Sequence, residues 1–308
     1  MICFRIVRAL RRTAPEYSRL IVPLRRSAQC KTMPAVDIPQ HLAHKKRLIF
    51  IIVIAIASAM GVFTQEAIPQ DPHYNNFADT RYFLGIPNFY DVASSVAFVL
   101  VGAVGLAMLR SSKSQGVLRA LRSGYAVFFI ATIFIGLGSA YYHLEPDNAT
   151  LVWDRLPMAA AFMAFLCIIV GEHISERYGR NLLIPLLLFG SLSVFYWYFT
   201  ELHGRGDLRF YVLVQYLPIV LVPLIMLLFP SRLKPSTFMW APLAAYVLAK
   251  VFELGDRPVY DAIGISGHTL KHLISCIGIL FVVVAIRVRV PRMSPDCLPL
   301  SLPPSVNL

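Results

Sequence analysis

The sequence predicts an all-α polytopic membrane protein. Of its 308 residues, 57% are hydrophobic and only 15% are charged, and the mean hydropathy is +0.62. A soluble domain of this length does not have enough interior to bury so much apolar surface. Long apolar runs also recur at intervals of roughly thirty residues, which is typical of helices that cross a bilayer one after another.

The net charge of +12 does not indicate nucleic-acid binding in this chain. The basic residues gather in the N-terminal segment and in alternate loops between the apolar runs, where membrane proteins carry them on the cytoplasmic side. The cysteines show no CxxC or paired spacing; they are Cys3, Cys30, Cys167, Cys276 and Cys297. The sequence therefore predicts no nucleic-acid partner, no disulfide framework and no thiolate metal site.

Residues 1–47 are too polar to span a bilayer. They hold eleven Lys and Arg against two acidic residues, Glu16 and Asp37. We expect this segment to be a basic, disordered cytoplasmic tail. Two alternatives stay open, because an Arg-rich and acid-poor segment also resembles an organelle transit peptide, and because translation from Met33 would leave out the first 32 residues.

Eight apolar runs are long enough to form transmembrane helices at a rise of about 1.5 Å per residue. In order along the chain they are residues 48–64, 91–110, 122–143, 151–173, 181–200, 210–229, 237–254 and 266–286. The first run is short. The seventh contains Lys250 and Glu253, which we expect to pair with each other because they lie three residues apart.

The loops between these runs alternate in charge. With the N-terminus inside, the inner loops and the C-terminal tail hold eleven Lys and Arg, whereas the outer loops hold four. This bias fits the positive-inside rule and predicts that both termini are cytoplasmic. The loop at 144–150 then lies on the outer side, and we expect Glu172, His173 and Glu176 to be solvated at the inner end.

Polar side chains from distant parts of the sequence fall on the same outer side in this topology. They are Ser139, His143, Asp154, His268 and His272. Ionisable groups at membrane depth are costly and usually functional. Positions four apart share a helix face, so Ser139 lies beside His143. By the same spacing, His268 and His272 can offer two imidazoles to one ion.

Two histidines from one helix and one from another give three nitrogen ligands with an open fourth position, as in catalytic zinc sites. A water in that position has its pKa lowered toward neutrality and becomes a nucleophile. Asp154 can orient that water or act as a general base, and Ser139 can donate to a developing oxyanion.

Other interpretations of the same residues stay open. Histidines on different membrane helices can ligate haem, although two ligands one turn apart suit a single small ion better. Ser139 can simply allow close helix packing next to Gly138, and Asp154 can form an interfacial ion pair with Arg155.

Four motifs then occur in a fixed order along the chain. They are Asn88-Phe89-Tyr90-Asp91-Val92-Ala93-Ser94-Ser95, Gly138-Ser139 with His143, Asp154-Arg155-Leu156-Pro157-Met158, and His268 with His272. Together they resemble the alkaline ceramidases, which belong to a superfamily of seven-helix membrane hydrolases. That superfamily includes the adiponectin-type receptors and proteins that remodel the lipids of GPI anchors. The resemblance extends from about Tyr74 to Arg287.

The resemblance implies a seven-helix hydrolase core formed by the second to eighth apolar runs. The chain then divides into the tail at 1–47, an additional transmembrane helix at 48–64, an outer loop at 65–90, the core at 91–286 and a cytoplasmic C-terminal tail at 287–308. Within the core, aromatic residues can line a lipid cavity. The candidates are Phe128, Phe129, Phe162, Phe165 and Phe195.

The function that the resemblance implies is a zinc-dependent amidase that hydrolyses ceramide, a membrane lipid, to a sphingoid base and a fatty acid. Zinc is expected on His143, His268 and His272, with Asp154 near the bound water and Ser139 beside the reacting carbonyl. Two alternatives stay open. One is a lipid ester hydrolase or GPI-lipid remodeller with the same metal site, and the other is a non-catalytic receptor or scaffold with structural zinc.

One departure from the family pattern concerns calcium. Eukaryotic members carry a calcium site before the first core helix, built from an acidic, tryptophan-containing segment and a glutamate. Here Asn88 stands at the glutamate position, and Asp79 is the other candidate ligand. Calcium takes six to eight oxygen ligands. We therefore predict no calcium site, and the departure favours a bacterial inner membrane over an organelle membrane.

Overall fold

The computed structural model describes residues 38–112 and 114–292. The rest of the predicted N-terminal and C-terminal tails lies outside the described residues. The helices are α2 (Ile38–Phe63), α3 (Phe89–Arg110), α4 (Arg122–Leu144), α5 (Asn148–His173), α6 (Glu176–Leu202), α7 (Arg209–Leu228), α8 (Ala241–Leu254), α9 (Asp256–Ile263) and α10 (Gly267–Val288). Short 3-10 turns, η2 (Arg119–Leu121) and η3 (Thr237–Trp240), precede α4 and α8. The strands β1 (Leu233–Lys234) and β2 (Val290–Pro291) form one antiparallel pair.

Within the described ranges, eight helical spans are long and apolar enough to cross a membrane. These spans correspond one to one with the eight predicted runs, with η3 and α8 together forming the seventh. The prediction of an all-α polytopic membrane protein is therefore confirmed. Apart from the first span, the observed helix ends lie within a few residues of the predicted ends.

The first helix begins earlier than its hydropathy suggests. α2 starts at Ile38 instead of residue 48, so that Lys45, Lys46 and Arg47 belong to the helix and not to a tail. Lys and Arg are good helix formers whose long side chains reach polar surroundings, so an apolar run marks the membrane-buried part of a helix but not its start. A boundary between two structural units lies inside α2, between Ile49 and Phe50.

The short helix α9 was not predicted. It lies between α8 and α10, has a strongly amphipathic composition and buries none of its residues. Gly264 ends it with φ of 73°, a left-handed conformation that glycine adopts without steric cost. The turn that follows leads directly into α10, whose first residues carry two of the predicted ligands.

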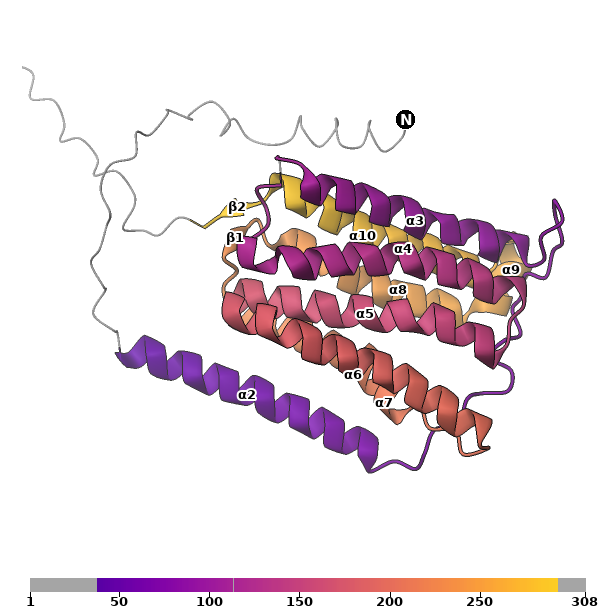
Figure 1. Ribbon diagram of the computed structural model, residues 1–308, viewed down its shortest axis with the longest axis horizontal. Coiled ribbons are helices and arrows are strands. Elements are labelled where there is room, and N and C mark those ends of the chain that lie inside the picture. Colours follow the sequence, from indigo (N-terminus) through magenta and orange to yellow (C-terminus); the bar gives the residue numbers. More distant parts are fainter. Residues whose placement is uncertain (1–37, 113, 293–308) are drawn as a thin grey trace, which may run out of the picture. The chain divides into compact units, whose positions relative to one another are not determined.

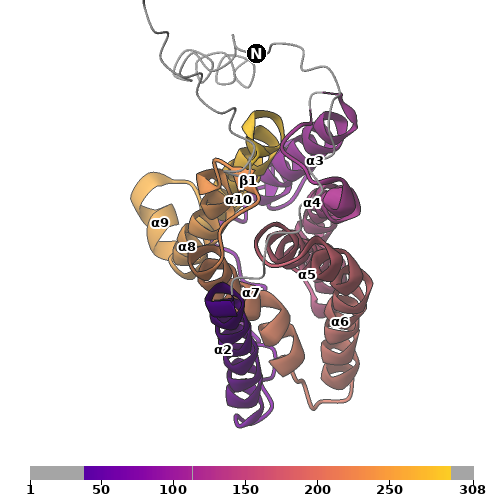
Figure 2. The same cartoon turned by 90° about the vertical axis from the view of Figure 1, so that its left-hand side faces the viewer.

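The second unit is a helix bundle in which the first and last core helices are neighbours (Figures 1 and 2). The helices α3, α4, α5 and α6 each pack against the next in sequence, and α7 packs against α5 and α6. The helix α10 packs against both α8 and α3. Because α4 and α10 are both neighbours of α3, residues more than a hundred positions apart meet at its N-terminal end.

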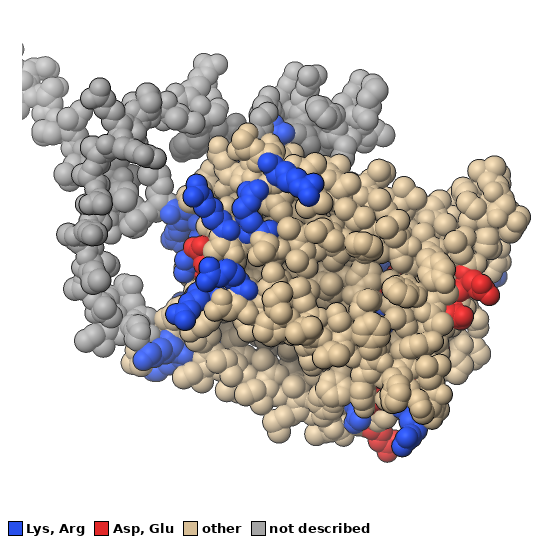
Figure 3. Space-filling view, in the orientation of Figure 1, with Lys and Arg blue, Asp and Glu red and all other residues tan. Residues whose placement is uncertain are grey.

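Basic residues gather at the opposite end of this bundle, where α3, α5, α7 and α10 end and the β1–β2 pair lies. They are visible as the blue group beside β1 and β2 in Figure 3. The described members are Arg110, Arg119, Arg122, Arg177, Arg180, Arg232, Lys234, Arg287 and Arg292. The two ends of the bundle therefore differ in charge, with the predicted histidine ligands at the less basic end.

The expectation that Glu172 is solvated at that basic end is wrong. Glu172 and Arg289 have fully buried side chains, and Arg289 Nη1 lies 2.7 Å from Glu172 Oε2. The Tyr125 hydroxyl also donates to Glu172, and Arg289 contacts the Gly116 carbonyl oxygen at 3.0 Å. His173 is buried as well, whereas Glu176 is partly exposed and pairs with Arg232. Arg289 follows α10 directly, so this ion pair connects the end of α10 to α5.

Candidate metal centre

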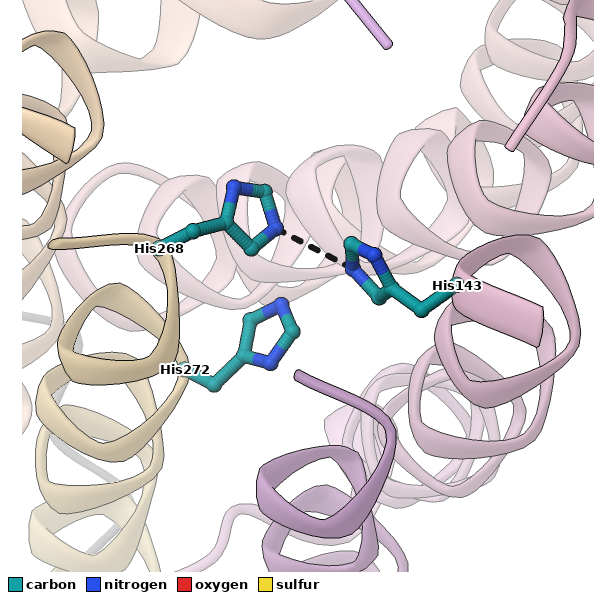
Figure 4. Close-up of side chains that lie close together, drawn as sticks. All are labelled: His143, His268 and His272. Carbon is teal, nitrogen blue, oxygen red and sulfur yellow. Dashed lines mark hydrogen bonds between the residues drawn. The ribbon is translucent and has the colours of Figure 1, made fainter. Parts of the chain in front are cut away.

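Three histidine side chains meet near the less basic end of the bundle. His143 lies near the end of α4, and His268 and His272 lie in the first two turns of α10. Their exposed fractions are 0%, 5% and 3%, and one ring nitrogen from each lies within 4.8 Å of the others. Figure 4 shows the three rings turned toward one another, with His143 Nε2 3.1 Å from His268 Nε2. Residues that are 125 positions apart therefore share one small volume.

The nitrogen arrangement fits a metal ion. Two ligands on a tetrahedral zinc, at bond lengths of 2.0–2.1 Å, are about 3.3 Å apart, close to the observed separation of the two Nε2 atoms. Imidazole nitrogen is also the ligand type that zinc and similar transition metals prefer. Without an ion, buried imidazole nitrogens would face one another with few hydrogen-bond partners, an arrangement that proteins avoid. The predicted convergence of the three histidines is confirmed as geometry.

A hydrogen bond to Ser94 sets the tautomer of His272. The Ser94 hydroxyl donates to the Asp91 carbonyl oxygen at 3.1 Å, which uses its single proton. The contact of 2.8 Å between Ser94 Oγ and His272 Nδ1 is then a bond donated by the ring. Nε2 of His272 is left with its lone pair toward the other histidines, as a metal ligand requires.

The first turn of α10 is held by acceptors from other elements. The Asp91 carboxylate on α3 accepts hydrogen bonds from the hydroxyls of Ser266 and Thr269 at 3.0 and 2.5 Å. The Asp256 carboxylate on α9 accepts from the backbone N–H groups of His268 and Ala78, both at 2.8 Å. These bonds fix where α10 begins and therefore where its two histidines point.

The C-terminal end of α4 is held in a similar way by the residue that precedes α3. The Asn88 side-chain amide donates to the His143 carbonyl oxygen at 2.8 Å. Asn88 has φ of 47°, in the left-handed region that asparagine tolerates better than most residues. Asp79, the other residue considered for calcium, pairs through its carboxylate with Arg81 at 2.6 Å.

Ser139 and Asp154 lie beside the histidines. Ser139 is 1% exposed, and its Oγ lies 3.4 Å from His272 Nε2 and 3.0 Å from the Ser95 hydroxyl oxygen. Asp154 on α5 is 9% exposed and lines the same cavity as Ser139 and His272. All five predicted site residues are therefore brought together.

The close approach of α4 to α5 depends on Gly138. A Cβ atom at this position would lie 2.0 Å from the Trp153 carbonyl oxygen, far inside contact distance. Only glycine lets the two helices come this near. The next residue on each helix, Ser139 on α4 and Asp154 on α5, is thereby placed in the site.

The alternative ion pair between Asp154 and Arg155 does not form. Arg155 is buried and stacks over the Trp197 ring, with its guanidinium carbon 4.2 Å from the ring centroid. It also donates to the Gln70 side-chain oxygen at 2.8 Å. Consecutive helical residues point in different directions. Asp154 therefore faces the cavity, and Arg155 faces an aromatic cluster.

A cavity of about 150 Å³ adjoins the site. Ser139, Asp154 and His272 form part of its wall, and most of the rest is apolar. Of the aromatic residues expected there, Phe128, Phe162 and Phe165 line the cavity. Two do not, since Phe129 is buried in helix packing and Phe195 is 49% exposed.

The supporting residues were given no role in the site from the sequence, although Asp91 and Ser94 belong to the first of the four motifs. The full set is Asp91, Ser94, Asp256, Ser266 and Thr269. The detectable signal was polarity in an apolar run, since an aspartate and two serines occur in the first two turns of α3. Their partners could not be assigned, because nothing in the spacing of α3 indicates which helix lies against it.

Comparison with known proteins relates this chain to one family. A family model described as Ceramidase matches residues 75–240, which is more than half of the chain. A Dictyostelium discoideum protein named "Putative alkaline ceramidase dcd3A" is 28% identical over 119 residues. That match covers 33% of this chain and 41% of the relative, so the similar part is less than half of the relative's length. His268 and His272 lie beyond the family match, whereas Ser139, His143 and Asp154 lie inside it.

Proposed function

This chain belongs to the ceramidase family, and from that membership we propose that it hydrolyses the amide bond of ceramide, releasing a sphingoid base and a fatty acid. The observation that carries the proposal is the buried group of His143, His268 and His272, which fits a metal ion. We propose that the ion is zinc. A zinc ion in a three-nitrogen site supplies Lewis acidity to a carbonyl and a water-derived nucleophile at neutral pH.

The remaining roles belong to residues of the cavity wall. Asp154, held next to Ser139, accepts a proton from the attacking water. Ser139 donates a hydrogen bond to the amide oxygen as negative charge develops there. As the C–N bond breaks, Asp154 returns the proton to the nitrogen, which leaves as the amine of the sphingoid base. His272 is kept in the correct tautomer by Ser94 throughout.

The apolar part of the cavity suits a lipid substrate. Phe128, Phe162 and Phe165 offer an aromatic wall beside the polar groups. At about 150 Å³ the cavity has the size that holds a benzene molecule, so it accommodates a segment of a ceramide and not the whole lipid. The remaining chain length extends between the helices toward the bilayer.

The orientation in the membrane is also a proposal. The basic end of the bundle faces the cytoplasm, both termini are cytoplasmic, and the site opens toward the outer leaflet, in agreement with the positive-inside rule. Reporter fusions in the loop at 144–150 test this. Reporter activity typical of the cytoplasmic side would contradict it.

The function is tested on purified full-length protein in detergent. We expect release of sphingoid base from ceramide, loss of that release with a chelator and its recovery on adding zinc. Replacement of His268 and His272 by alanine should abolish both zinc binding and hydrolysis. The matched control is His203→Ala, because His203 is exposed at the end of α6 and belongs to no ligand group. Hydrolysis that survives loss of the two histidines would refute the proposed site.

A further inference from the structure

The connection between α2 and α3 passes over the metal centre. It runs along the end of the bundle at which α3 and α10 begin (Figure 1). Within this connection, residues 74–79 (the 74–79 strap) form no helix or strand. The proposed mechanism uses no residue of the strap.

Phe77, in the middle of the strap, lies against two of the three histidines. Its ring centroid is 4.6 Å from that of His143 and 4.5 Å from that of His268, both in edge-to-face geometry. One side chain thus contacts a histidine from each of the two ligand-bearing helices. His272 has a different aromatic neighbour, Phe98, with the ring centroids 5.7 Å apart.

The Phe77 ring lies between solvent and these two imidazoles. Phe77 is partly exposed, whereas His143 and His268 are 0% and 5% exposed. A phenylalanine ring has no lone pair to offer a metal ion and no polar tip that attracts water. Phe77 can therefore exclude water from the metal centre without competing for its ligands.

Two hydrogen bonds hold the strap in place on either side of Phe77. The Tyr142 hydroxyl on α4 donates to the Asn75 side-chain oxygen at 2.6 Å. The Ala78 backbone N–H donates to the Asp256 carboxylate on α9 at 2.8 Å. Because both attachment points lie within two residues of Phe77, the position of its ring over the histidines is fixed by two different helices.

The cavity borders the metal centre at another histidine. Its wall includes His272 and the neighbouring Phe98 but neither His143 nor His268. The histidines that Phe77 contacts are therefore not the one that faces the cavity. The metal centre has two sides, one next to the apolar cavity and one under the strap.

The charges of the cavity suit the entry of a neutral lipid. The expected pair of Lys250 with Glu253 forms, and Lys271 Nζ lies 2.9 Å from the other oxygen of the same carboxylate. Asp154 lines the same wall, so that two lysines stand with two carboxylates. A hydrocarbon chain that enters the cavity thus meets an apolar wall with balanced charges.

We propose that Phe77 determines which molecules reach the metal centre, because its ring closes the side under the strap and leaves the apolar cavity as the route of access. A lipid reaches the three histidines through the cavity, whereas a water-soluble molecule meets the Phe77 ring. The inference deepens the proposed function and rests on it in one respect, since it takes the three histidines as the reactive centre.

The first test is modification of histidines by diethyl pyrocarbonate added from the aqueous phase. It uses the full-length protein in detergent after chelator treatment, and mass spectrometry gives the rate at each histidine. Phe77→Ala removes the ring, and Phe77→Leu keeps an apolar side chain in its place. Phe83→Ala is the matched control, because Phe83 is 55% exposed in the same connection and packs against Phe89 instead of a histidine. The exposed His203 is the internal reference.

We expect Phe77→Ala to raise the modification rates of His143 and His268 about tenfold to a hundredfold, because the reagent no longer needs a local opening of the strap. The rates at His272 and His203 should stay within about threefold of wild type, and so should all rates in Phe77→Leu and Phe83→Ala. An equal increase at all three buried histidines would indicate general loosening of the bundle, and no increase at His143 and His268 would show that the ring is no barrier. Either result would overturn the proposal.

The rates of zinc binding distinguish a barrier from a residue that positions the ligands. A barrier slows entry and exit alike, so Phe77→Ala should raise the association and dissociation rates by the same factor and leave the Kd within about twofold. A positioning role predicts faster release, unchanged uptake and a higher Kd. That second result in Phe77→Ala would assign Phe77 to holding the imidazoles and contradict the proposed barrier.

The modification test needs neither bound zinc nor turnover, so the two proposals can fail separately. Selective exposure of His143 and His268 in a protein that does not cleave ceramide would leave the barrier standing and refute the proposed function. Zinc-dependent cleavage with unchanged histidine modification in Phe77→Ala would do the reverse.

Discussion

The bond from Ser94 to His272 allows a quantitative prediction about metal affinity. In Ser94→Ala the His272 Nδ1–H loses its acceptor, 2.8 Å away, in a residue that is only 3% exposed. A buried donor without a partner costs about 1–3 kcal/mol. Loss of such an outer-shell partner typically reduces metal affinity by about 10- to 100-fold. The two ranges agree, because tenfold corresponds to about 1.4 kcal/mol.

The assay is competition for zinc between the purified protein and a chelator of known affinity. Ser94→Thr keeps a hydroxyl and should retain most of the affinity. Ser95→Ala is the matched control, since Ser95 is the next buried residue of α3 and bonds to Ser139 instead of to a histidine. Wild-type zinc affinity in Ser94→Ala, or an equal loss in Ser95→Ala, would refute the tautomer argument.

Three further predictions concern packing, a buried ion pair and a helix cap. Gly138→Ala should abolish most ceramide hydrolysis and lower the melting temperature, because the added Cβ would lie 2.0 Å from the Trp153 carbonyl oxygen. The control Gly61→Ala should match wild type, because a Cβ at Gly61 would have no atom within 4 Å. Arg289→Met should lower the free energy of unfolding by about 3–5 kcal/mol, because it leaves Glu172 buried without its cation. The control Arg232→Met removes an exposed ion pair and should lower it by at most about 1 kcal/mol. An equal effect of the two arginine variants would contradict this. The Thr150 backbone N–H donates to the Asp147 carboxylate and lowers the pKa of Asp147 in the folded protein. The ionised carboxylate therefore stabilises the folded protein above the ordinary carboxyl pKa, and this stabilisation is lost as the pH falls through the pKa of Asp147 in the folded protein. Asp147→Ala should thus lower stability by about 1 kcal/mol near neutral pH, with a difference from wild type that narrows on acidification in pH-dependent thermal unfolding; a difference independent of pH would argue against the cap.

The membrane spans were predictable because hydropathy and length report directly on burial in a bilayer. The shared faces of Ser139 with His143 and of His268 with His272 were predictable because helix periodicity alone decides them. Helix starts were less predictable, as α2 shows. Its first residues are polar and helical, and polarity does not distinguish a helical turn from a tail.

The environment of single charges was harder to predict. Glu172 sits in a stretch that is polar in sequence, and solvation was the natural expectation. Its burial depends on an ion pair with Arg289, which lies 117 residues away, directly after the end of α10. Lys271 presents the same difficulty, because its partner Glu253 lies on another helix. A local pattern contains no information about a partner that only helix packing supplies.

The helix α3 has a larger part in the site than the sequence suggested, although it supplies none of the three ligands. The ligand-bearing helices α4 and α10 both pack against α3. Asn88, just before α3, holds the carbonyl of His143, and Ser94 on α3 holds the ring of His272. The short segment from Asn88 to Ser94 thus contacts a histidine on each of the two ligand-bearing helices, α4 and α10. The position of His143 relative to His272 is therefore set by the N-terminal turns of α3, whose geometry determines whether the three nitrogens can reach one ion.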